Sequence, residues 1–346
     1  DAIWISPFYK SPMADFGYDV EDYQAVDPMF GSMEDFDKLL AEAHARGIKV
    51  VIDGVFSHTS DEHPWFKESR QNHKNTKADW YVWANPGSDG GPPNNWLSVF
   101  GGSSWEWDPR RRQYYLHNFL KKQPDLNWHN PDVQDAILEQ MKFWLDKGVD
   151  GIRLDAINYG MHDPQLRHNP PRHDLAPAGE YGGPLHNPYG MQMHWHDKTR
   201  PEMHRMLERM RQLADQYPGQ RFLMGEVSSD DDIRTTVEYS APGRLHSTYN
   251  FCMFGPAKLK DDRSLIERVF TYFQQLEQHY GQAWPSWAFS NHDVMRVMSR
   301  WGDGQNPAAA KQFMALLLCL RGTACIYQGE ELGLSEANVA YADMQD

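Results

Sequence analysis

The stretch "GIRLDAIN", residues 151–158, alternates apolar and charged residues and is predicted to end a buried β-strand. Ile152 and Leu154 would point to one side of the strand and Arg153 and Asp155 to the other, because successive side chains alternate. A buried charge is costly unless it is paired or used. An arginine and an aspartate on the same face of a mostly apolar strand therefore indicate a functional pair.

Short apolar segments alternate with amphipathic segments along the chain. Helices are predicted from Ser32, a suitable cap, to Gly47, and from Asn130 to Gly148. Further helices are expected near 202–216, 264–279 and 308–320. The predicted strands are 1–6, 47–56, 149–157, 221–227, 246–251, 286–291 and 324–329. This alternation predicts a parallel sheet, either wound open or closed into a barrel.

Two stretches interrupt the alternation. Residues 59–130 are rich in Trp, Asn, Gly and Pro, and are predicted to form a small irregular subdomain. Residues 158–200 are predicted to form a long loop, and such loops at the carboxyl ends of barrel strands carry active sites. This loop contains six histidines, but no carboxylate or cysteine accompanies them at ligand spacing, so a solvated loop is favoured over a metal site.

Composition limits the classes of partner. The 346-residue chain is 40% hydrophobic and 24% charged, as expected of a folded globular protein, and its net charge is -14. This charge argues against a nucleic-acid backbone or an anionic membrane surface as partner, and no apolar run is long enough to span a bilayer. Three cysteines without ligand spacing favour buried, reduced thiols in a cytoplasmic protein.

Polar side chains follow four of the predicted strands at the point where each strand ends. The carboxyl ends of parallel strands meet at one mouth of a barrel, so we expect these side chains to lie close together. They are Asp53 and His58, Arg153 and Asp155, Glu226, and finally Asn291, His292 and Asp293.

Three acids around one pocket suit the cleavage of a glycosidic bond. A retaining glycosidase needs a carboxylate nucleophile and a protonated carboxylic acid about 5 Å apart. Glu226 follows the apolar residues "FLM", a setting that would keep its proton, and Arg153 is expected to lower the pKa of Asp155. A metal-dependent hydrolase would instead explain Asp53, His58, His292 and Asp293. A sugar-binding module would explain the 13 tryptophans but not three convergent acids.

Six motifs in order along the chain resemble the α-amylase family, glycoside hydrolase family 13, and within it the α-glucosidase and oligo-1,6-glucosidase group. "DGVFSH", "GIRLDAIN", "GEV" and "FSNHD" resemble its four conserved regions, "QPDLN" its additional region, and "GEELG" the end of the last barrel strand. The resemblance implies an α/β fold, a (β/α)8 TIM barrel built from residues 1–58 and 131–346, with an inserted B domain at 59–130.

The resemblance also implies roles for single residues. Asp155 would be the nucleophile, Glu226 the acid/base, and Asp293 the carboxylate that steadies the distorted sugar. Arg153, His58 and His292 would bind the innermost glucose. Asp15 and Tyr18 match the pair that grips and stacks on this glucose, although their positions also suit ordinary turn and core residues. No cofactor and no metal are implied, since Ser57 stands where many calcium-dependent amylases have asparagine.

The resemblance further implies a truncated barrel. The first barrel strand is expected before residue 1, and a C-terminal β domain and a loop that supplies an arginine after residue 346. Ala156, next to the nucleophile, favours α-1,4 bonds. The expected function is that of a retaining, exo-acting α-1,4-glucosidase with a covalent glucosyl-enzyme intermediate and an oligosaccharide substrate. Alternatives are an α-glucosyl transferase, an oligo-1,6-glucosidase, and an inactive relative or sugar-binding protein; the oligomeric state stays open.

Overall fold

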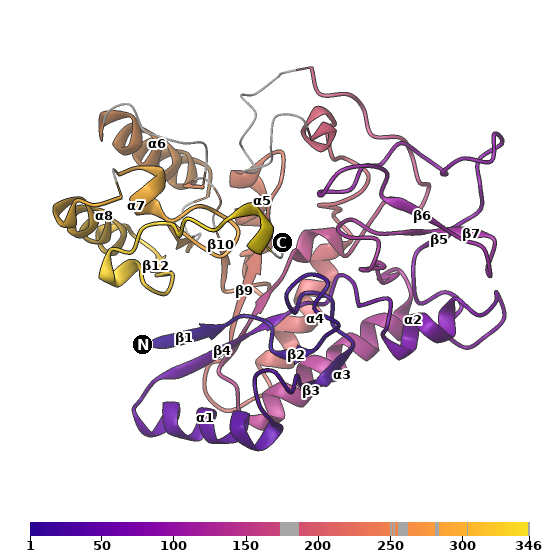
Figure 1. Cartoon of the computed structure of the whole chain (residues 1–346), viewed down its shortest axis with the longest axis horizontal. Helices are drawn as coiled ribbons and strands as arrows, with labels where there is room; N and C mark the ends of the chain where they lie inside the picture. The colour runs from indigo at the N-terminus through magenta and orange to yellow at the C-terminus, as the bar shows by residue number, and fades with distance from the viewer. Residues whose placement is uncertain are drawn as a thin grey trace. The chain divides into compact units, whose positions relative to one another are not determined.

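The computed structural model describes residues 1–173, 187–249, 251, 253–254, 262–280, 284–302 and 304–344. The chain divides into two compact units. The first comprises residues 1–173, 187–226 and 242–246, and the second comprises the described residues within 227–241 and 247–346. Figure 1 labels the helices and strands of both units.

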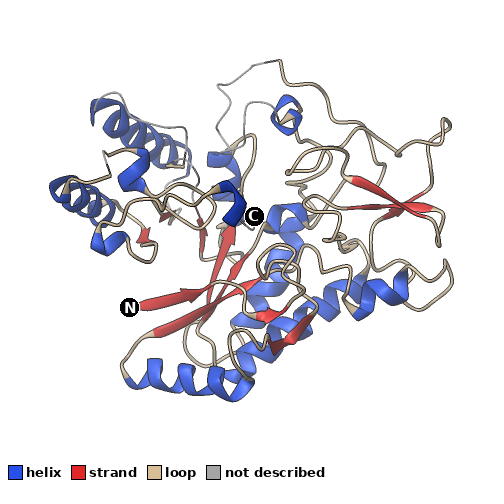
Figure 2. Ribbon diagram, in the orientation of Figure 1, coloured by secondary structure: helices blue, strands red, loops and turns tan. Residues whose placement is uncertain are grey.

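Four parallel strands form the sheet of the first unit. They are β1 (Ala2–Ile5), β4 (Lys49–Gly54), β8 (Gly151–Leu154) and β9 (Phe222–Glu226), hydrogen-bonded in that order (Figure 2). Asp53 pairs with Arg153 across β4 and β8, and Arg153 pairs with Met224 across β8 and β9. This register places the end of β4 directly beside the Arg153–Asp155 pair.

Three long helices accompany these strands. Helix α1 (Met33–Ala45) begins at a capping box between Ser32 and Asp35, and α3 (Pro131–Lys147) is capped by Asn130 and ended by Gly148 at φ 100°. Both helices lie where the sequence predicts them. Apolar stripes face the core in α1 and in the third helix, α4 (Met203–Ala214). The buried residues are Phe36, Leu40 and Ala43 in α1, and Met203, Met206, Leu207, Met210 and Ala214 in α4.

Smaller elements lie between the strands of the first unit. β2 (Tyr9–Lys10) pairs antiparallel with β3 (Asp22–Val26), and helix α2 covers Pro64–Ser69. A three-stranded antiparallel sheet has the order β5 (Trp83–Ala84), β7 (Gln113–Leu116) and β6 (Trp105–Asp108). Its buried core contains Val82, Ala84, Trp96, Trp105 and Leu116. The boundaries of the inserted domain, 59–130, stay a prediction.

The second unit contains its own parallel strands, β10 (Ser247–Tyr249), β11 (Ser286–Trp287) and β12 (Thr323–Ala324). A core around Trp287, Phe289 and Leu317 holds them against the neighbouring helices. These helices are α5 (Asp232–Tyr239), α6 (Asp262–Tyr280), α7 (Val297–Arg300) and α8 (Pro307–Cys319), followed by the 3-10 turns η3 (Glu330–Leu332) and η4 (Tyr341–Asp343).

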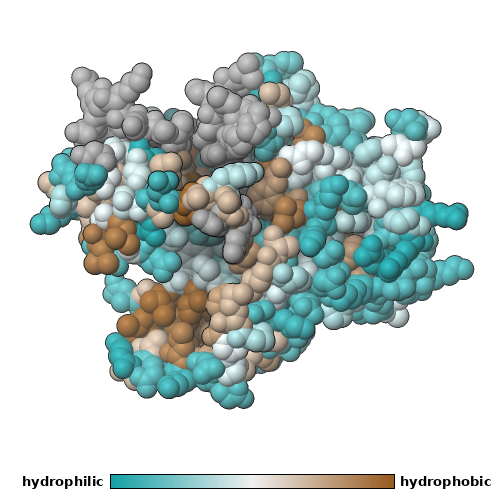
Figure 3. Space-filling view, in the orientation of Figure 1, coloured by the Kyte–Doolittle hydropathy of each residue, from teal (hydrophilic) through white to brown (hydrophobic). Residues whose placement is uncertain are grey.

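The accessibility of two cysteines corrects one prediction. Cys319 is exposed and Cys325 is half-buried, so the expectation that these two thiols are buried is wrong; Cys252 lies outside the described residues. Figure 3 shows apolar residues gathered over β1 and α1, where Ile3 and Leu39 are exposed. In the described part of the chain, no helix is long and apolar enough to cross a membrane.

Candidate active site

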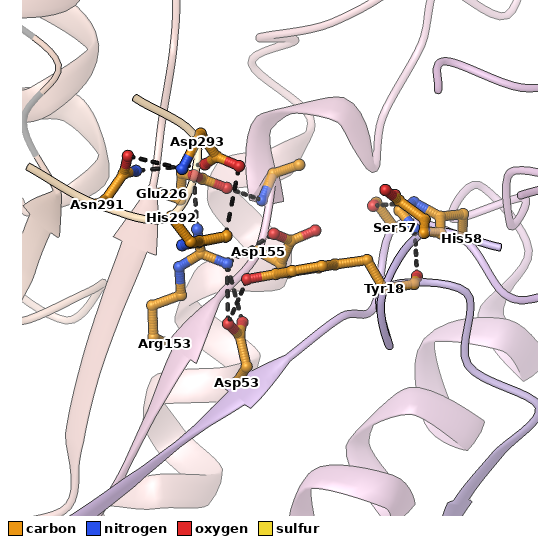
Figure 4. Close-up of polar contacts among 12 residues, drawn as sticks. Tyr18, Asp53, Ser57, His58, Arg153, Asp155, Glu226, Asn291, His292 and Asp293 are labelled. Atoms are coloured by element: carbon orange, nitrogen blue, oxygen red, sulfur yellow. Dashed lines mark hydrogen bonds and ion pairs between the residues drawn. The ribbon is translucent and has the colours of Figure 1, made fainter. Parts of the chain in front are cut away.

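Arg153 lies at the centre of the candidate site, with three carboxylates around its guanidinium (Figure 4). Its Nη1 lies 2.9 Å from Oδ1 of Asp53 and 2.6 Å from Oδ1 of Asp155, and its Nη2 lies 2.5 Å from Oε1 of Glu226. The arginine side chain is 1% exposed, and its guanidinium stacks over the ring of Trp4 in β1 at 5.0 Å. The two acids predicted as nucleophile and acid/base therefore meet at one buried cation.

The strand order explains this convergence. Glu226 is the last residue of β9, Asp155 follows the last residue of β8, and Asp53 stands one residue before the end of β4. Strand β8 lies between β4 and β9, so an arginine on β8 can contact acidic residues from both of its neighbours. Parallel strands align these ends although 173 residues separate Asp53 from Glu226 in the chain.

The charge balance of this cluster corrects two predictions. When all three carboxylates are ionised, one guanidinium leaves the cluster at a charge of minus two. Burial raises the pKa of Asp155 well above its usual range; Arg153 opposes this shift, and the nearby Glu226 adds to it. The predicted lowering of the pKa of Asp155 is therefore wrong, because burial outweighs the opposing effect of Arg153. The apolar setting predicted for Glu226 is also wrong, because Arg153 contacts its carboxylate.

The backbone after Asp155 provides a second contact to Glu226. Ala156 adopts a left-handed conformation, φ 40° and ψ 38°, which is uncommon for a residue with a side chain. Its N–H donates a hydrogen bond of 3.0 Å to Oε2 of Glu226. The 3-10 turn η1 (Ile157–Tyr159) follows immediately. Both oxygens of Glu226 are thus held, one by a cation and one by a backbone donor.

The predicted glucose-binding residues of the first unit belong to one polar network. Tyr18 donates its hydroxyl hydrogen to Oδ2 of Asp53 at 3.2 Å, and burial raises the pKa of Tyr18 well above its usual value. Gln123 donates from Nε2 to Oδ2 of Asp15 at 2.5 Å, and the same nitrogen lies 3.2 Å from Nε2 of His58. The structure therefore brings Asp15, Tyr18 and His58 into contact with the Arg153 cluster or with each other.

A buried carboxylate holds the turn that carries Asp15 and Tyr18. Asp19, which is inaccessible, accepts hydrogen bonds from the Ser11 hydroxyl at 2.8 Å and from the backbone N–H groups of Ala14 and Asp15 at 3.0 Å. These contacts fix the backbone on both sides of the turn. The positions of Asp15 and Tyr18 are therefore set by local hydrogen bonds rather than by packing alone.

The two remaining predicted residues, His292 and Asp293, belong to the second unit. They follow β11 in a turn closed by Asn291, whose Oδ1 accepts from the N–H groups of Asp293 and Val294 at 3.0 Å. Nε2 of His292 lies 3.5 Å from Oδ1 of Asp293. The convergence of these two residues with Asp155 and Glu226 stays a prediction.

The family resemblance assigns no role to two residues of the network. The sequence pattern identifies Asp53 only as a polar strand end, which a metal-dependent hydrolase would also explain, and Gln123 only as part of the motif "QPDLN". The signal for Asp53 was available in principle, because a carboxylate opposite Arg153 on a neighbouring strand neutralises part of its charge. No local pattern could identify Gln123, which contacts Asp15 across 108 residues of sequence.

The histidine-rich segment differs from the predicted solvated loop. His162 and His194 are buried, and Nδ1 of His194 lies 2.6 Å from Oδ2 of Asp197. Burial lowers the pKa of His162 to about 3. His186 lies outside the described residues. Over the described ranges of the chain, no group of three or more His, Cys, Asp or Glu side chains could hold a metal ion.

Comparisons with known proteins agree with this geometry. The chain is 53% identical over 352 residues to a protein named probable alpha-glucosidase from Rhizobium meliloti (strain 1021), and 41% identical over 362 residues to an oligo-1,6-glucosidase from Heyndrickxia coagulans. Both alignments include 100% of this chain and 62% of the relative, so the chain spans about 62% of the length of these relatives.

A solved structure, described as the alpha-glucosyl transfer enzyme XgtA, matches 100% of this chain and 63% of its own chain, with 56% identity and a TM-score of 0.94. The model of the family "Alpha amylase, catalytic domain" matches residues 1–346. With the parallel strands of both units, these matches confirm the predicted fold class, a truncated (β/α)8 barrel. The chain belongs to the α-amylase catalytic-domain family.

Proposed function

We propose that this chain carries the active centre of a retaining, exo-acting α-glucosidase that removes terminal α-1,4-linked glucose from maltose-type oligosaccharides. The observation that carries the proposal is the contact of Asp155 and Glu226, from adjacent strands, with the single guanidinium of Arg153. The names of the relatives, alpha-glucosidase and oligo-1,6-glucosidase, support the same reaction class.

In the proposed reaction, Asp155 attacks the anomeric carbon of the terminal glucose while Glu226 gives its proton to the departing glycosidic oxygen. The glycosidic C–O bond breaks as the Asp155–glucose ester bond forms. Glu226 then removes a proton from water, whose oxygen displaces Asp155 and releases glucose with its original configuration. Arg153 holds both carboxylates in place, and Asp15, Tyr18 and His58 bind the glucose hydroxyls and ring face. The family resemblance assigns Asp293 and His292 to the same reaction.

Transfer of the glucosyl group is the second candidate function. The same covalent intermediate can react with an acceptor hydroxyl instead of water, and the neighbour XgtA is described as an alpha-glucosyl transfer enzyme. Cleavage of α-1,6 bonds is the third, since relatives are named oligo-1,6-glucosidase. Ala156 beside the nucleophile supports the α-1,4 preference. Rates on maltose and isomaltose, with free glucose and transfer products counted separately, distinguish the three.

The decisive experiment identifies the covalent intermediate in the protein that contains this chain. Incubation with 5-fluoro-α-glucosyl fluoride and peptide mass spectrometry should place the glucosyl adduct on Asp155. Asp155→Asn should form no adduct and release no glucose from maltose, whereas the exposed control Glu139→Gln should behave as the unmodified protein. Hydrolysis of p-nitrophenyl α-glucoside, whose leaving group contributes no second glucose, should first release α-glucose in the proton NMR spectrum. An adduct elsewhere, an active Asp155→Asn or β-glucose as the first sugar released from this substrate would refute the proposal.

A further inference from the structure

Six non-glycine residues of the first unit hold left-handed backbone conformations, and two of them lie on either side of one asparagine, Asn158, which follows the first by two residues and is hydrogen-bonded to the second. Ala156 has φ 40° and Thr199 has φ 55°. The conformation is a genuine outlier for a β-branched residue such as threonine, and it persists only where the surroundings over-determine it. The contacts of Thr199 therefore indicate which interaction depends on its strained backbone conformation.

Thr199 binds Asn158 twice. Its N–H donates to the backbone oxygen of Asn158 at 2.7 Å, and the side-chain Nδ2 of Asn158 donates to Oγ1 of Thr199 at 2.9 Å. Asn158 is inaccessible and is the middle residue of η1. The left-handed Thr199 thus presents its amide and its hydroxyl to η1 at the same time.

Lys198 adds a third contact to the same turn. Its side chain is 1% exposed, and Nζ donates to the hydroxyl of Tyr159 at 3.0 Å. The ammonium lies 4.7 Å from the ring centre of Tyr159 and 5.4 Å from that of Tyr189, which belongs to η2 (Pro188–Met191). The two tyrosine hydroxyls are 2.8 Å apart, and Asp197 is anchored by His194 at 2.6 Å. These contacts therefore hold the segment 197–199 in place beside η1.

The turn η1 leads directly to the acid/base candidate. The N–H of Tyr159 donates to the backbone oxygen of Ala156 at 2.9 Å, and the N–H of Ala156 donates to Oε2 of Glu226 at 3.0 Å. The direction of the Ala156 N–H depends on its unusual backbone angles, which η1 maintains. A displacement of η1 would consequently turn this donor away from Glu226.

We propose that Thr199 and Lys198 are positioning residues that clamp Asn158 and Tyr159 and thereby hold the Ala156 N–H against the carboxylate of Glu226. This inference rests on the proposed function of Glu226 as acid/base. The clamp therefore sets the orientation in which Glu226 meets the substrate.

Thr199→Gly tests the clamp, because glycine adopts φ 55° without strain. The substitution removes Oγ1 but relieves the backbone, so we expect Tm to stay unchanged or to rise while kcat on maltose falls about 10- to 100-fold. KM should change little. Thr199→Ser, which keeps the hydroxyl, should restore most of kcat. Lys198→Met, which loses the contact with the Tyr159 hydroxyl, should share the fall in kcat with little change in KM.

Arg112→Gly provides the matched control. Arg112 has φ 53°, is exposed and lies in the turn between β6 and β7, so glycine relieves the same strain without touching η1. We expect unchanged kcat and unchanged KM. Unmodified kcat in Thr199→Gly, or equal losses of Tm and kcat in Thr199→Gly and Thr199→Ser, would overturn the clamp. An active Asp155→Asn would instead overturn the proposed function, so the two failures are distinguishable.

Discussion

The hydroxyl oxygen of Ser57 lies 2.9 Å from Nδ1 of His58, the next residue in the chain. The other ring nitrogen, Nε2, lies 2.9 Å from the backbone oxygen of Tyr18. A carbonyl oxygen can only accept, so Nε2 carries the hydrogen and Nδ1 accepts from Ser57. Burial lowers the pKa of His58 to about 4, which keeps the ring neutral. Ser57 thus fixes the tautomer of His58 that carries its hydrogen on Nε2. This is the serine that stands where many calcium-dependent amylases have asparagine.

The first prediction concerns this tautomer. In the nitrogen-15 NMR spectrum of histidine-labelled protein, His58 should titrate with a pKa of about 4 and show a protonated Nε2 above it. Because the folded pKa lies below the unfolded value, this histidine stabilises the fold above about pH 6.5, and this contribution is lost as the pH falls through about 4. Ser57→Ala leaves a buried acceptor without its donor and should lower the free energy of unfolding by about 1–3 kcal/mol.

Ser60→Ala is the control for this measurement. Ser60 is equally buried, but its hydroxyl oxygen accepts from the backbone N–H of Glu62 and does not contact His58. The His58 resonances should therefore keep their positions in this variant. A protonated Nδ1 in the unmodified protein, or a charged ring at pH 6, would contradict the assignment.

The second prediction concerns Arg153 as a structural cation. Arg153→Met leaves Asp53, Asp155 and Glu226 buried together without their shared positive charge, so the free energy of unfolding should fall by about 3–5 kcal/mol at pH 8. Part of this loss should be recovered at pH 5. Burial already raises the pKa of Asp155 above its unfolded value, so without Arg153 the folded state is favoured at low pH and loses stability as the pH rises.

Urea unfolding at the two pH values measures this effect, with Arg209→Met as the matched control. Arg209 contacts Asp135 at 2.5 Å on the surface of helices α3 and α4, where an ion pair contributes at most about 1 kcal/mol. A loss of similar size in both variants, or no recovery of Arg153→Met at pH 5, would show that the three carboxylates do not depend on Arg153.

The Arg153–Asp155 pair shows which features of the site can be predicted from the sequence and which cannot. Strand periodicity alone placed both side chains on one face, and strand order placed Glu226 at the same edge. Neither pattern could predict the charge balance of the cluster. This balance depends on Asp53, which lies 100 residues earlier in the chain and pairs in register with Arg153. The convergence of Asp155 and Glu226 was therefore predicted correctly, whereas the direction of the pKa shift of Asp155 was not, because burial outweighs the effect of Arg153.

Helix α5 and strand β12 show where local patterns fail. Helix α5 contains two threonines and a valine, which are weak helix formers, and it depends on Asp231 as cap to the N–H of Arg234. The sequence predicted a strand at 324–329, but β12 covers Thr323–Ala324, and Gly329 takes φ 85° in the following turn. An apolar run in the sequence does not show at which residue a strand stops pairing with its neighbour.

The third prediction concerns Asp125 in the motif "QPDLN". This carboxyl is buried, accepts from the side-chain amide of Asn118, and burial raises its pKa to about 8. Since the unfolded value is about 3.9, Asp125 costs stability progressively as the pH rises towards 8. Asp125→Asn mimics the protonated acid, so its Tm should exceed that of the unmodified protein at pH 9 and match it at pH 4.

For Asp108→Asn we expect the opposite effect on Tm. Asp108 is also buried, but it pairs with Arg70 at 2.7 Å and accepts from two backbone N–H groups. Loss of its charge should lower Tm at pH 9. A pH-independent Tm difference for Asp125→Asn in thermal scans between pH 4 and 9 would show that Asp125 is ionised in the folded protein throughout this range.

The fourth prediction concerns Gln123, whose orientation is determined by its partners. Oε1 accepts from the N–H of Leu120 at 2.9 Å, so Nε2 faces Oδ2 of Asp15 at 2.5 Å. Gln123→Glu would bring a second carboxylate against Asp15, and the repulsion should displace Asp15 from the glucose that it binds in the proposed function. We expect KM for maltose at pH 8 to rise about tenfold, equivalent to ~1.4 kcal/mol, with a smaller change in kcat.

The pH dependence of this variant separates repulsion from a simple loss of shape. At pH 5 the carboxyl introduced by Gln123→Glu would share a proton with Asp15 and donate to it as the amide does, so KM should return towards the unmodified value. Gln134→Glu adds the same charge on α3, where Gln134 donates to the backbone oxygen of Trp128, and should leave KM unchanged. A KM for Gln123→Glu that is raised equally at pH 5 and pH 8 would mean that Gln123 shapes the site sterically rather than by donating to Asp15.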